Sequence, residues 1–432
     1  MMKKSLILLL ALVLLLSACA SSEPGKTVSG EENATATATE PVPTKEVDFE
    51  YPTITSVKTE QDLDQIPVAQ PGMTEDELRA IVVDAMQFQL NLVWTPSEKV
   101  SYSYPAAGAS DADGMLRFHK GIRYGGLPYT QAASDVTPLL DRLDPETGVL
   151  NVEKLSMMDT IGNNCATAVY WAWARVSTTQ KGFGTHNLCP KNNVVLLGDL
   201  ETELNGGNYE VQSTKAIIEQ NGDQKIFAAY ASAKRGDGLV GYVKGGQHHA
   251  MLLTEDPHVV RNADGTINGT DSYVIVSEEY SRIHAVRGED GQIQRVGGLN
   301  NKYSFQTLMR KFYLAISVAE LQDPSLVEKA EVSLDLPEET ALADLGEAKV
   351  KSNYAVSRVI TRFTDESGKT VYESRRYGAA KGDPKELGLF SGAATAAAVR
   401  RSIGVGTFRL EVSVRLANGE NSVVYQGKCT IS

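Results

Sequence analysis

The sequence predicts two folded domains, an α+β domain over about residues 71–330 and a small all-β sandwich over about residues 331–432. The first prediction comes from two stretches with helical spacing of apolar residues, which precede a series of short β-like runs. The second comes from several short stretches in which apolar and polar residues alternate, as they do along half-buried strands. With 432 residues, the chain is long enough for both domains and a tail.

The start of the chain has the pattern of an export signal. Two lysines are followed by an uncharged apolar run over residues 6–16, and the letters LSAC end at Cys19. The run is too short to span a bilayer stably. Small residues before a cysteine resemble the bacterial lipobox, which implies that residues 1–18 are a signal peptide and that Cys19 carries lipid. Because two acyl chains anchor a protein stably, we expect a lipoprotein on the extracytoplasmic face of the cell membrane. The alternative is an ordinary signal peptide with a chance cysteine.

Residues 19–70 are expected to form a disordered, lipid-anchored linker. Up to about Gln61 they are rich in Ser, Thr, Ala, Glu and Pro and lack apolar periodicity, so they cannot bury enough surface to offset the entropy of ordering. Such a linker spaces the folded part from the membrane. The net charge of −12 argues against nucleic acid as a partner, and against attraction to anionic wall polymers through bulk charge.

The α+β domain is expected to start near Pro71. Thr74 and Glu77 have the spacing of a capping box, and helical spacing of apolar residues follows. The segment GNNCATAVYWAWARV predicts a second, buried helix that begins at or just after Cys165. Beyond about Asn193, turn signals separate β-like runs, which are NVVLLG, KIFAAYA, GLVGYV, HHAMLLTE, SYVIVSEEYS and KYSFQTLM.

The sandwich is predicted from four alternating stretches, SNYAVSRVITRFT, KTVYESRR, GTFRLEVSVRLA and SVVYQGKCTI. Ser367-Gly368 and Asn418-Gly419 lie where hairpin turns are expected. Because no cluster of catalytic residue types occurs here, we interpret this domain as a binding or spacer module.

Cys165 is the candidate nucleophile. A helix N-terminus lowers the pKa of a thiol, because the helix dipole and the free N–H groups favour negative charge. Besides Cys19, the chain has Cys165, Cys189 and Cys429, an odd number, so at least one is free or pairs between chains. A buried structural cysteine is an equally good interpretation of the position of Cys165 alone.

Two further residue types complete a possible cysteine-hydrolase site. His249 opens a β-like run and is the candidate base, whereas the adjacent His248 points to the opposite face. A carboxylate from the next run, Glu278 or Glu279, would orient the imidazole and stabilise the imidazolium. Each of these histidines and carboxylates also has a non-catalytic interpretation, as an ordinary surface or strand-end residue.

The order of cysteine on a helix, histidine on a strand and a polar residue on the next strand resembles papain-like folds, most closely bacterial NlpC-type and CHAP peptidoglycan hydrolases. GNNCATAVYWAW, AKRGDGLVGY, QHHAMLL and SYVIVSEEY are similar to their motifs between about residues 121 and 280. The resemblance implies a papain-like fold for the first domain and favours Glu278 as the third residue. GIRYGGLPY resembles the NlpC-type Gly-x-x-Tyr-Gly-Gly stretch, which implies that Tyr124 lies near the oxyanion site.

We therefore expect a cysteine amidohydrolase or endopeptidase that cleaves peptidoglycan stem peptides, with Cys165 as nucleophile and His249 as base and then acid. Asn163 or Asn164 is expected to add a side-chain donor for the oxyanion. The usual Asp-Cys-Ser of the family is Asn164-Cys165-Ala166 here, which leaves open a non-catalytic surface binding protein with a papain-like shell.

Two further alternatives give the cysteines a role other than catalysis. In one of them, Cys165 and Cys189 form a structural disulfide. In the other, His186 and Cys189 bind a metal, although two ligands without a partner pair make a poor site. We expect neither a metal nor another cofactor.

Overall fold

The structure is a computed structural model, which describes residues 58–103, 115–152, 161–178, 185, 188–189, 194–202, 213–243, 246, 248–288, 291–380, 385–390 and 393–432. The predicted signal peptide, Cys19, most of the predicted linker and His186 lie outside the described residues. Within the described part of the chain, no helix is both long enough and apolar enough to cross a bilayer.

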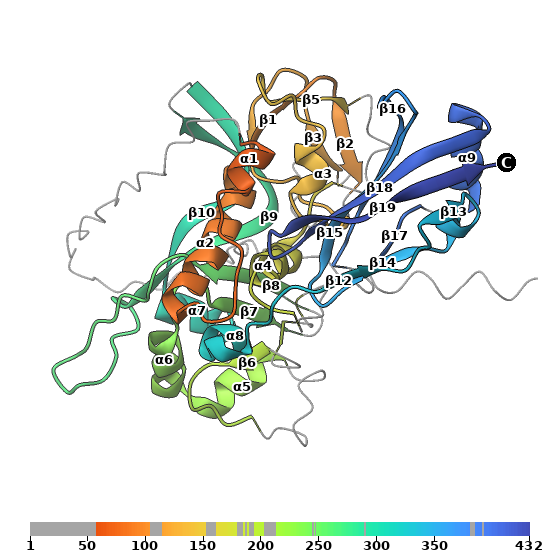
Figure 1. Ribbon diagram of the computed structural model, residues 1–432. Helices are drawn as coiled ribbons and strands as arrows, with labels where there is room; N and C mark the ends of the chain where they lie inside the picture. The colour runs from red at the N-terminus through yellow and green to blue at the C-terminus, as the bar shows by residue number, and fades with distance from the viewer. Residues whose placement is uncertain are drawn as a thin grey trace, which may run out of the picture.

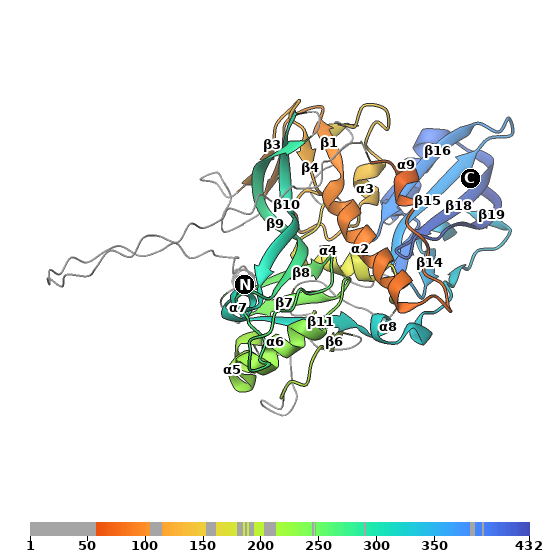
Figure 2. The same ribbon diagram turned by 90° about the vertical axis from the view of Figure 1, so that its left-hand side faces the viewer.

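The first domain contains helices and strands in mixed order (Figures 1 and 2). Its helices are α1 (Glu60–Leu63), α2 (Glu75–Asn91), α3 (Thr137–Leu140), α4 (Cys165–Trp173), α5 (Thr214–Asn221), α6 (Asp223–Ser232), α7 (Phe305–Arg310) and α8 (Ala319–Gln322). Its strands are β1 (Val93–Pro96), β2 (Val100–Ser103), β3 (Met115–Phe118), β4 (Tyr124–Gly125), β5 (Val149–Leu150), β6 (Val194–Leu196), β7 (Gly238–Tyr242), β8 (His248–Leu253), β9 (Tyr273–Gly288), β10 (Gly291–Ser304) and β11 (Tyr313–Val318).

A nine-stranded sheet with the order β5-β1-β4-β10-β9-β8-β7-β11-β6 organises this domain. Successive side chains of a strand point to opposite faces, and the apolar run of β8 therefore serves two cores. Leu252 packs in the core that contains α2 and α4, whereas Met251 packs in the core that contains α5, α6 and α7. The result is a mixed α/β architecture that is compatible with the predicted α+β class.

Two of the predicted strands are helices. The run KIFAAYA lies in α6, and the letters FQTLM of the last run lie in α7. In α6 the apolar Ile226, Phe227 and Tyr230 form one buried face, and a short apolar run fits this spacing as well as it fits a strand.

The folded part begins earlier than the predicted boundary at Pro71. The capping box that starts α2 is present, since the Thr74 amide donates to the Glu77 carboxylate at 2.8 Å. However, α1 precedes it, and Leu63, Ile66 and Ala69 are buried in the core that contains α2. Residues 58–70 therefore belong to the folded domain and not to the predicted linker.

The second domain begins at β12 (Val332–Leu334) and contains two sheets around one core. One sheet has the order β12-β14-β17, and the other has the order β13-β19-β18-β15-β16. The remaining bounds are β13 (Glu339–Ala341), β14 (Lys349–Ser352), β15 (Val356–Thr364), β16 (Thr370–Tyr377), β17 (Glu386–Gly388), α9 (Ala393–Ile403), β18 (Gly406–Leu416) and β19 (Asn421–Ile431). The helix α9 departs from the all-β prediction, and its alanine-rich sequence has high helix propensity.

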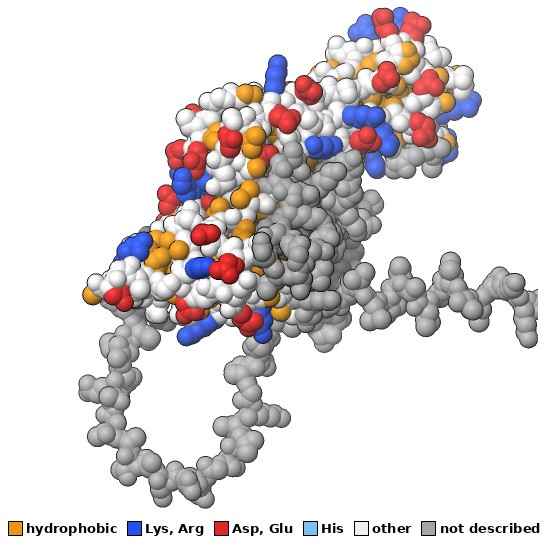
Figure 3. Space-filling model, turned by 90° about the horizontal axis from the view of Figure 1, so that it is seen from below, with side chains coloured by type: hydrophobic (Ala, Val, Ile, Leu, Met, Phe, Trp, Pro, Cys, Tyr) orange, Lys and Arg blue, Asp and Glu red, His pale blue; other side chains and the backbone are white. Residues whose placement is uncertain are grey.

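The two domains pack closely against each other, and Figure 3 shows them as two lobes with mixed acidic and basic side chains on the visible face. Arg358 of β15 pairs with Glu60 at 2.7 Å and with Asp141 at 2.5 Å. Arg415 of β18 pairs with Glu60 at 2.9 Å. An apolar cluster next to these pairs includes Trp171 of α4 together with residues of the second domain, Ala355, Ala380 and Ala417.

Candidate active site

Cys165 is the first residue of α4, as predicted. Asn164 caps the helix, because its Oδ1 accepts from the amides of Ala166 and Thr167, both at 3.1 Å. The Asn164 amide in turn donates to Thr167 Oγ1 at 2.8 Å, which completes a capping box. The cap holds the sulfur at a helix N-terminus, where the dipole favours a thiolate.

His249 and Glu278 come from neighbouring strands, β8 and β9. His249 Nε2 lies 2.5 Å from Glu278 Oε2. The other carboxylate oxygen of Glu278 accepts from Asn301 Nδ2 at 2.8 Å and from the Tyr303 hydroxyl at 2.7 Å. Glu278 is therefore the carboxylate that contacts the imidazole, and its position is held by two donors from β10.

Because α4 packs against β8, Cys165 lies close enough to His249 for their side chains to shift each other's pKa, so three segments that are far apart in sequence meet here. Burial raises the pKa of the thiol, but His249, the Tyr129 hydroxyl and the Ala250 amide together outweigh burial and hold this pKa below its usual value. Burial lowers the pKa of His249, but Cys165 and Glu278 together raise it to about 10. Burial also raises the pKa of Glu278, but His249, Asn301 and Tyr303 together outweigh burial and lower this pKa below its usual value. These directions describe a thiolate–imidazolium pair supported by a carboxylate.

The tyrosine beside the sulfur is Tyr129 and not the predicted Tyr124. The Tyr129 hydroxyl donates to Cys165 Sγ at 3.7 Å, and this hydrogen bond helps to lower the thiol pKa. Tyr124 is buried between Trp94 and Phe118, and its hydroxyl accepts from the His119 amide at 2.8 Å. Among the described interactions of Tyr124, none reaches Cys165, so the prediction for Tyr124 is corrected.

A loop contact places Tyr129 next to the nucleophile. The segment around Tyr129 forms a parallel bridge with Asn163, just before α4. The Thr130 amide donates to the Asn163 carbonyl at 2.8 Å, which keeps the two segments together. Tyr129 is the last letter of the motif GIRYGGLPY, and only its proximity to Asn163 in the fold distinguishes it from Tyr124.

The two asparagines have different roles. Asn163 Nδ2 donates to Gln89 Oε1 at 2.7 Å, so this side chain joins the loop to α2. Asn164 uses its oxygen for the helix cap, and its Nδ2 donates none of the described hydrogen bonds. In the first turn of α4, the Cys165 amide likewise donates none of the described hydrogen bonds. The Cys165 amide and Asn164 Nδ2 are therefore two donors next to the sulfur's residue that none of the described hydrogen bonds uses.

Glu279 is fully buried beside the site but does not contact the imidazole. Among the described residues, neither of its carboxylate oxygens has a hydrogen-bond partner. Burial raises the pKa of Glu279 well above the ordinary value, and Arg295 opposes this only in part. A neutral carboxyl is the form that such an environment favours.

The other described cysteines are separate from this chemistry. Cys165, Cys189 and Cys429 are all free thiols, so the alternative disulfide between Cys165 and Cys189 is absent. Burial raises the pKa of Cys189 to about 12 and is the main cause that raises that of Cys429 to about 11. Within the described residues, no group of His, Cys, Asp and Glu side chains is arranged to hold a metal ion.

Comparisons with known proteins do not assign the chain to a family. No protein-family model matches it, and a search of curated proteins finds no match.

Proposed function

We propose that the chain is a membrane-anchored cysteine amidohydrolase or endopeptidase with a papain-like first domain. The observation that carries the proposal is the convergence of Cys165, His249 and Glu278 from α4, β8 and β9. A buried structural cysteine would not need an imidazole that is oriented by a carboxylate with two further donors. A nucleophile, a base and a group that orients the base are the parts that covalent amide hydrolysis requires.

In the proposed acylation step, the Cys165 thiolate attacks the amide carbonyl carbon. The oxygen becomes an oxyanion next to the Cys165 amide, with Asn164 Nδ2 and the Tyr129 hydroxyl as further donors. His249, as imidazolium, then donates its proton to the leaving amine, and the C–N bond breaks. The products of this step are a free amine and a thioester on Cys165.

In the deacylation step, neutral His249 accepts a proton from a water molecule, which attacks the thioester carbonyl. Collapse of the second tetrahedral intermediate breaks the C–S bond and releases a carboxylic acid. His249 is left protonated beside the thiolate, so the resting ion pair is restored. Glu278 keeps the ring in one orientation throughout and stabilises its charged form.

The proposed substrate is a peptidoglycan stem peptide. The support is the lipobox-like LSAC ending at Cys19, because a lipid-anchored extracytoplasmic enzyme meets the wall as its most plentiful amide polymer. The second domain is proposed to be a spacer or a binding module, since its sequence contains no cluster of catalytic residue types. Cleavage of a peptide that does not come from the wall would follow the same two steps, and only the molecule that carries the scissile bond would differ.

A digest of purified peptidoglycan, analysed by mass spectrometry, tests the proposal. We expect the native chain to release fragments with a new amino terminus, and Cys165→Ala to release none while retaining the native circular dichroism spectrum. Cys189→Ala is the matched control, because it also removes a buried thiol but leaves the triad intact, and it should retain activity. Equal activity of Cys165→Ala would overturn the proposal, and failure of the native chain to cleave either peptidoglycan or peptide amides would favour the binding-protein alternative.

A further inference from the structure

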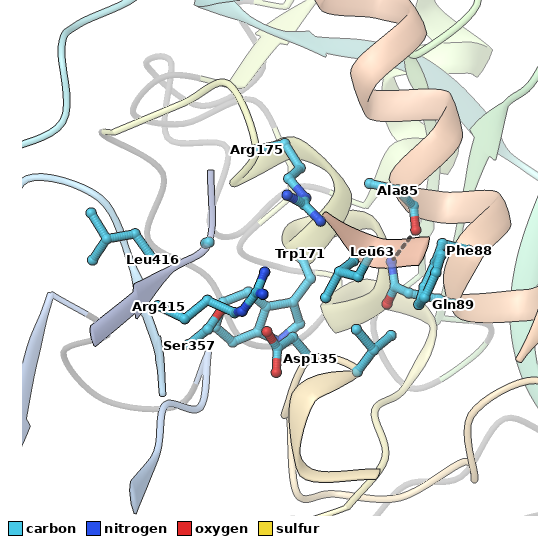
Figure 4. A pocket seen from close by; sticks show the side chains of 12 residues that line it. Leu63, Ala85, Phe88, Gln89, Asp135, Trp171, Arg175, Ser357, Arg415 and Leu416 are labelled. Carbon is cyan, nitrogen blue, oxygen red and sulfur yellow. Dashed lines mark hydrogen bonds between the residues drawn. The ribbon is translucent and has the colours of Figure 1, made fainter. Parts of the chain in front are cut away.

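A small cavity lies where the end of α4 meets the second domain. Its volume is about 30 Å³, whereas about 10–15 Å³ is enough to hold one water molecule. Figure 4 shows Arg175, which follows α4, and Arg415, from β18, with their guanidinium groups directed towards the space between the domains. Asp135, Ser357 and Trp171 also line this cavity.

Two of the side chains that line the cavity carry buried hydrogen-bond donors without a partner among the described residues. Arg175 is 6 % exposed as a whole residue, and its side chain donates none of the described hydrogen bonds. Its Nη1 is fully buried without a partner, as are Nε and Nη1 of Arg415, which also lines the cavity. A buried donor without an acceptor costs about 1–3 kcal/mol, and more when it is charged. Several such donors around one space point to an acceptor that occupies it.

Asp135, the carboxylate that lines the cavity, does not supply that acceptor. Asp135 accepts from the Thr137 amide at 3.1 Å, and its side chain also bonds Ser357 and the Thr137 hydroxyl. Burial raises the pKa of Asp135, which disfavours its charged form. Glu60 and Asp64 bind Nη2 of Arg415 at its outer side. The inner donors of both arginines are therefore left for another group.

The positive charges of Arg175 and Arg415 also favour an anion in the cavity. Burial, together with the charge of Arg415, lowers the pKa of Arg175 to about 10, although the carboxylates of Asp135 and Asp64 oppose this. Two buried guanidinium groups repel each other in a medium of low dielectric constant. A negative charge between them would remove the repulsion and satisfy the donors at the same time.

We propose that this cavity binds a small monovalent inorganic anion of the size of chloride, held between Arg175 and Arg415. The anion would join the end of α4 to β18 of the second domain. Because α4 begins with Cys165, the site would fasten the second domain to the helix that positions the candidate nucleophile. The proposal concerns the domain interface and does not depend on the proposed catalytic activity.

The test compares thermal unfolding of the purified full chain in sodium chloride, sodium bromide and sodium gluconate at equal ionic strength. Gluconate is much larger than the cavity, so it controls for general salt effects. We expect both halides to raise the unfolding midpoint by roughly a few degrees in a saturable manner. Arg175→Met should lose this difference. Arg409→Met should keep it, because Arg409 is an exposed residue on the same strand as Arg415.

A second measurement uses only the native chain, so it does not require that a variant folds. Addition of the native chain should broaden the NMR line of chloride. Bromide should reverse this broadening, since both ions would compete for one site. Equal midpoints in halide and gluconate, together with no line broadening, would mean that the cavity holds only water and would overturn the proposal. A halide effect that Arg175→Met retains would place the anion elsewhere and would overturn it as well.

Discussion

His249 Nε2 lies 2.5 Å from Glu278 Oε2, and Glu278 is itself held by Asn301 and Tyr303. Glu278→Gln removes the negative charge that stabilises the imidazolium but keeps the size of the side chain. We expect the rate of peptide-amide hydrolysis to fall by roughly 10²- to 10⁴-fold. Steady-state kinetics on a synthetic peptide that contains the bond identified in the wall digest would measure the loss.

Glu279→Gln is the matched control for this variant. Glu279 is adjacent and equally buried, but its environment favours the neutral carboxyl, so an amide changes little charge. Its activity should stay close to that of the native chain. Equal losses in the two variants would show that burial, and not contact with His249, decides the effect.

The ion pair of Cys165 and His249 predicts how thiol reactivity depends on pH. The lowered pKa of Cys165 means that its thiolate persists to a lower pH than that of an ordinary thiol and is lost only as the pH falls through that lowered value. Iodoacetamide should therefore label Cys165 faster than Cys189 or Cys429, whose pKa values are raised by burial. Because the pKa of His249 is about 10, activity should decline as the pH rises through that value. Slow and equal labelling of all three thiols would argue against a nucleophilic Cys165.

Tyr129→Phe tests the contact that replaces the predicted role of Tyr124. The variant removes the hydroxyl that donates to Cys165 Sγ, so the thiolate loses one stabilising donor. We expect the pH profile of Cys165 alkylation to move to higher pH and the hydrolysis rate to fall. Tyr124→Phe also removes a buried hydroxyl, but its partner is the His119 amide, so it should reduce stability without moving the alkylation profile.

Asp141 connects the two domains through buried charges. It accepts from Arg358 at 2.5 Å and from the Tyr377 hydroxyl at 2.9 Å, and its side chain is only 3 % exposed. Asp141→Asn removes one of the two carboxylates that Arg358 contacts and leaves Glu60 as the other, so the free energy of unfolding should fall by about 1.5–3 kcal/mol in urea titrations, as for the loss of a hydrogen bond to a charged group. Glu373→Gln breaks the more exposed pair with Arg362, and it should cost less than about 1 kcal/mol.

The proposed lipid anchor predicts where the chain is found in the cell. Cys19→Ala removes the thiol that would be acylated, so the protein should move from the membrane fraction to the extracytoplasmic soluble fraction. Detergent phase partitioning of the expressed protein would measure this. Native protein that partitions entirely into the aqueous phase would contradict the anchor and leave the chemistry of Cys165 unaffected.

Local patterns were sufficient to predict several parts of the structure. The start of α4 at Cys165 follows from the asparagine before it, because the cap is made within the first turn. The hairpins of the second domain follow from alternation and from glycines such as Gly368 and Gly419, which adopt positive φ. The contact of His249 with the strand that carries Glu278 follows from the order of the β-like runs, but periodicity left Glu278 and Glu279 equally possible.

The remaining features depend on contacts between distant parts of the chain. Residues of α1 look like linker in sequence, yet Glu60 pairs with Arg358 and Arg415 of the second domain. Tyr129 is brought to Cys165 by a loop bridge that has no sequence period. A short apolar run, as in α6, fits a helix or a strand, and only its packing against the sheet decides between them.

Trp171 belongs to the helix that begins with Cys165 and also to the apolar cluster that includes Ala355 and Ala417. Neither domain therefore has a complete hydrophobic surface of its own, and separation would expose this indole to water. The two domains should behave as a single cooperative unit in calorimetry, despite their distinct sheets. Deletion of the second domain should therefore cause the first domain to aggregate through the exposed apolar surface. For the same reason, a rearrangement of domains during evolution would have to transfer both sides of this interface together.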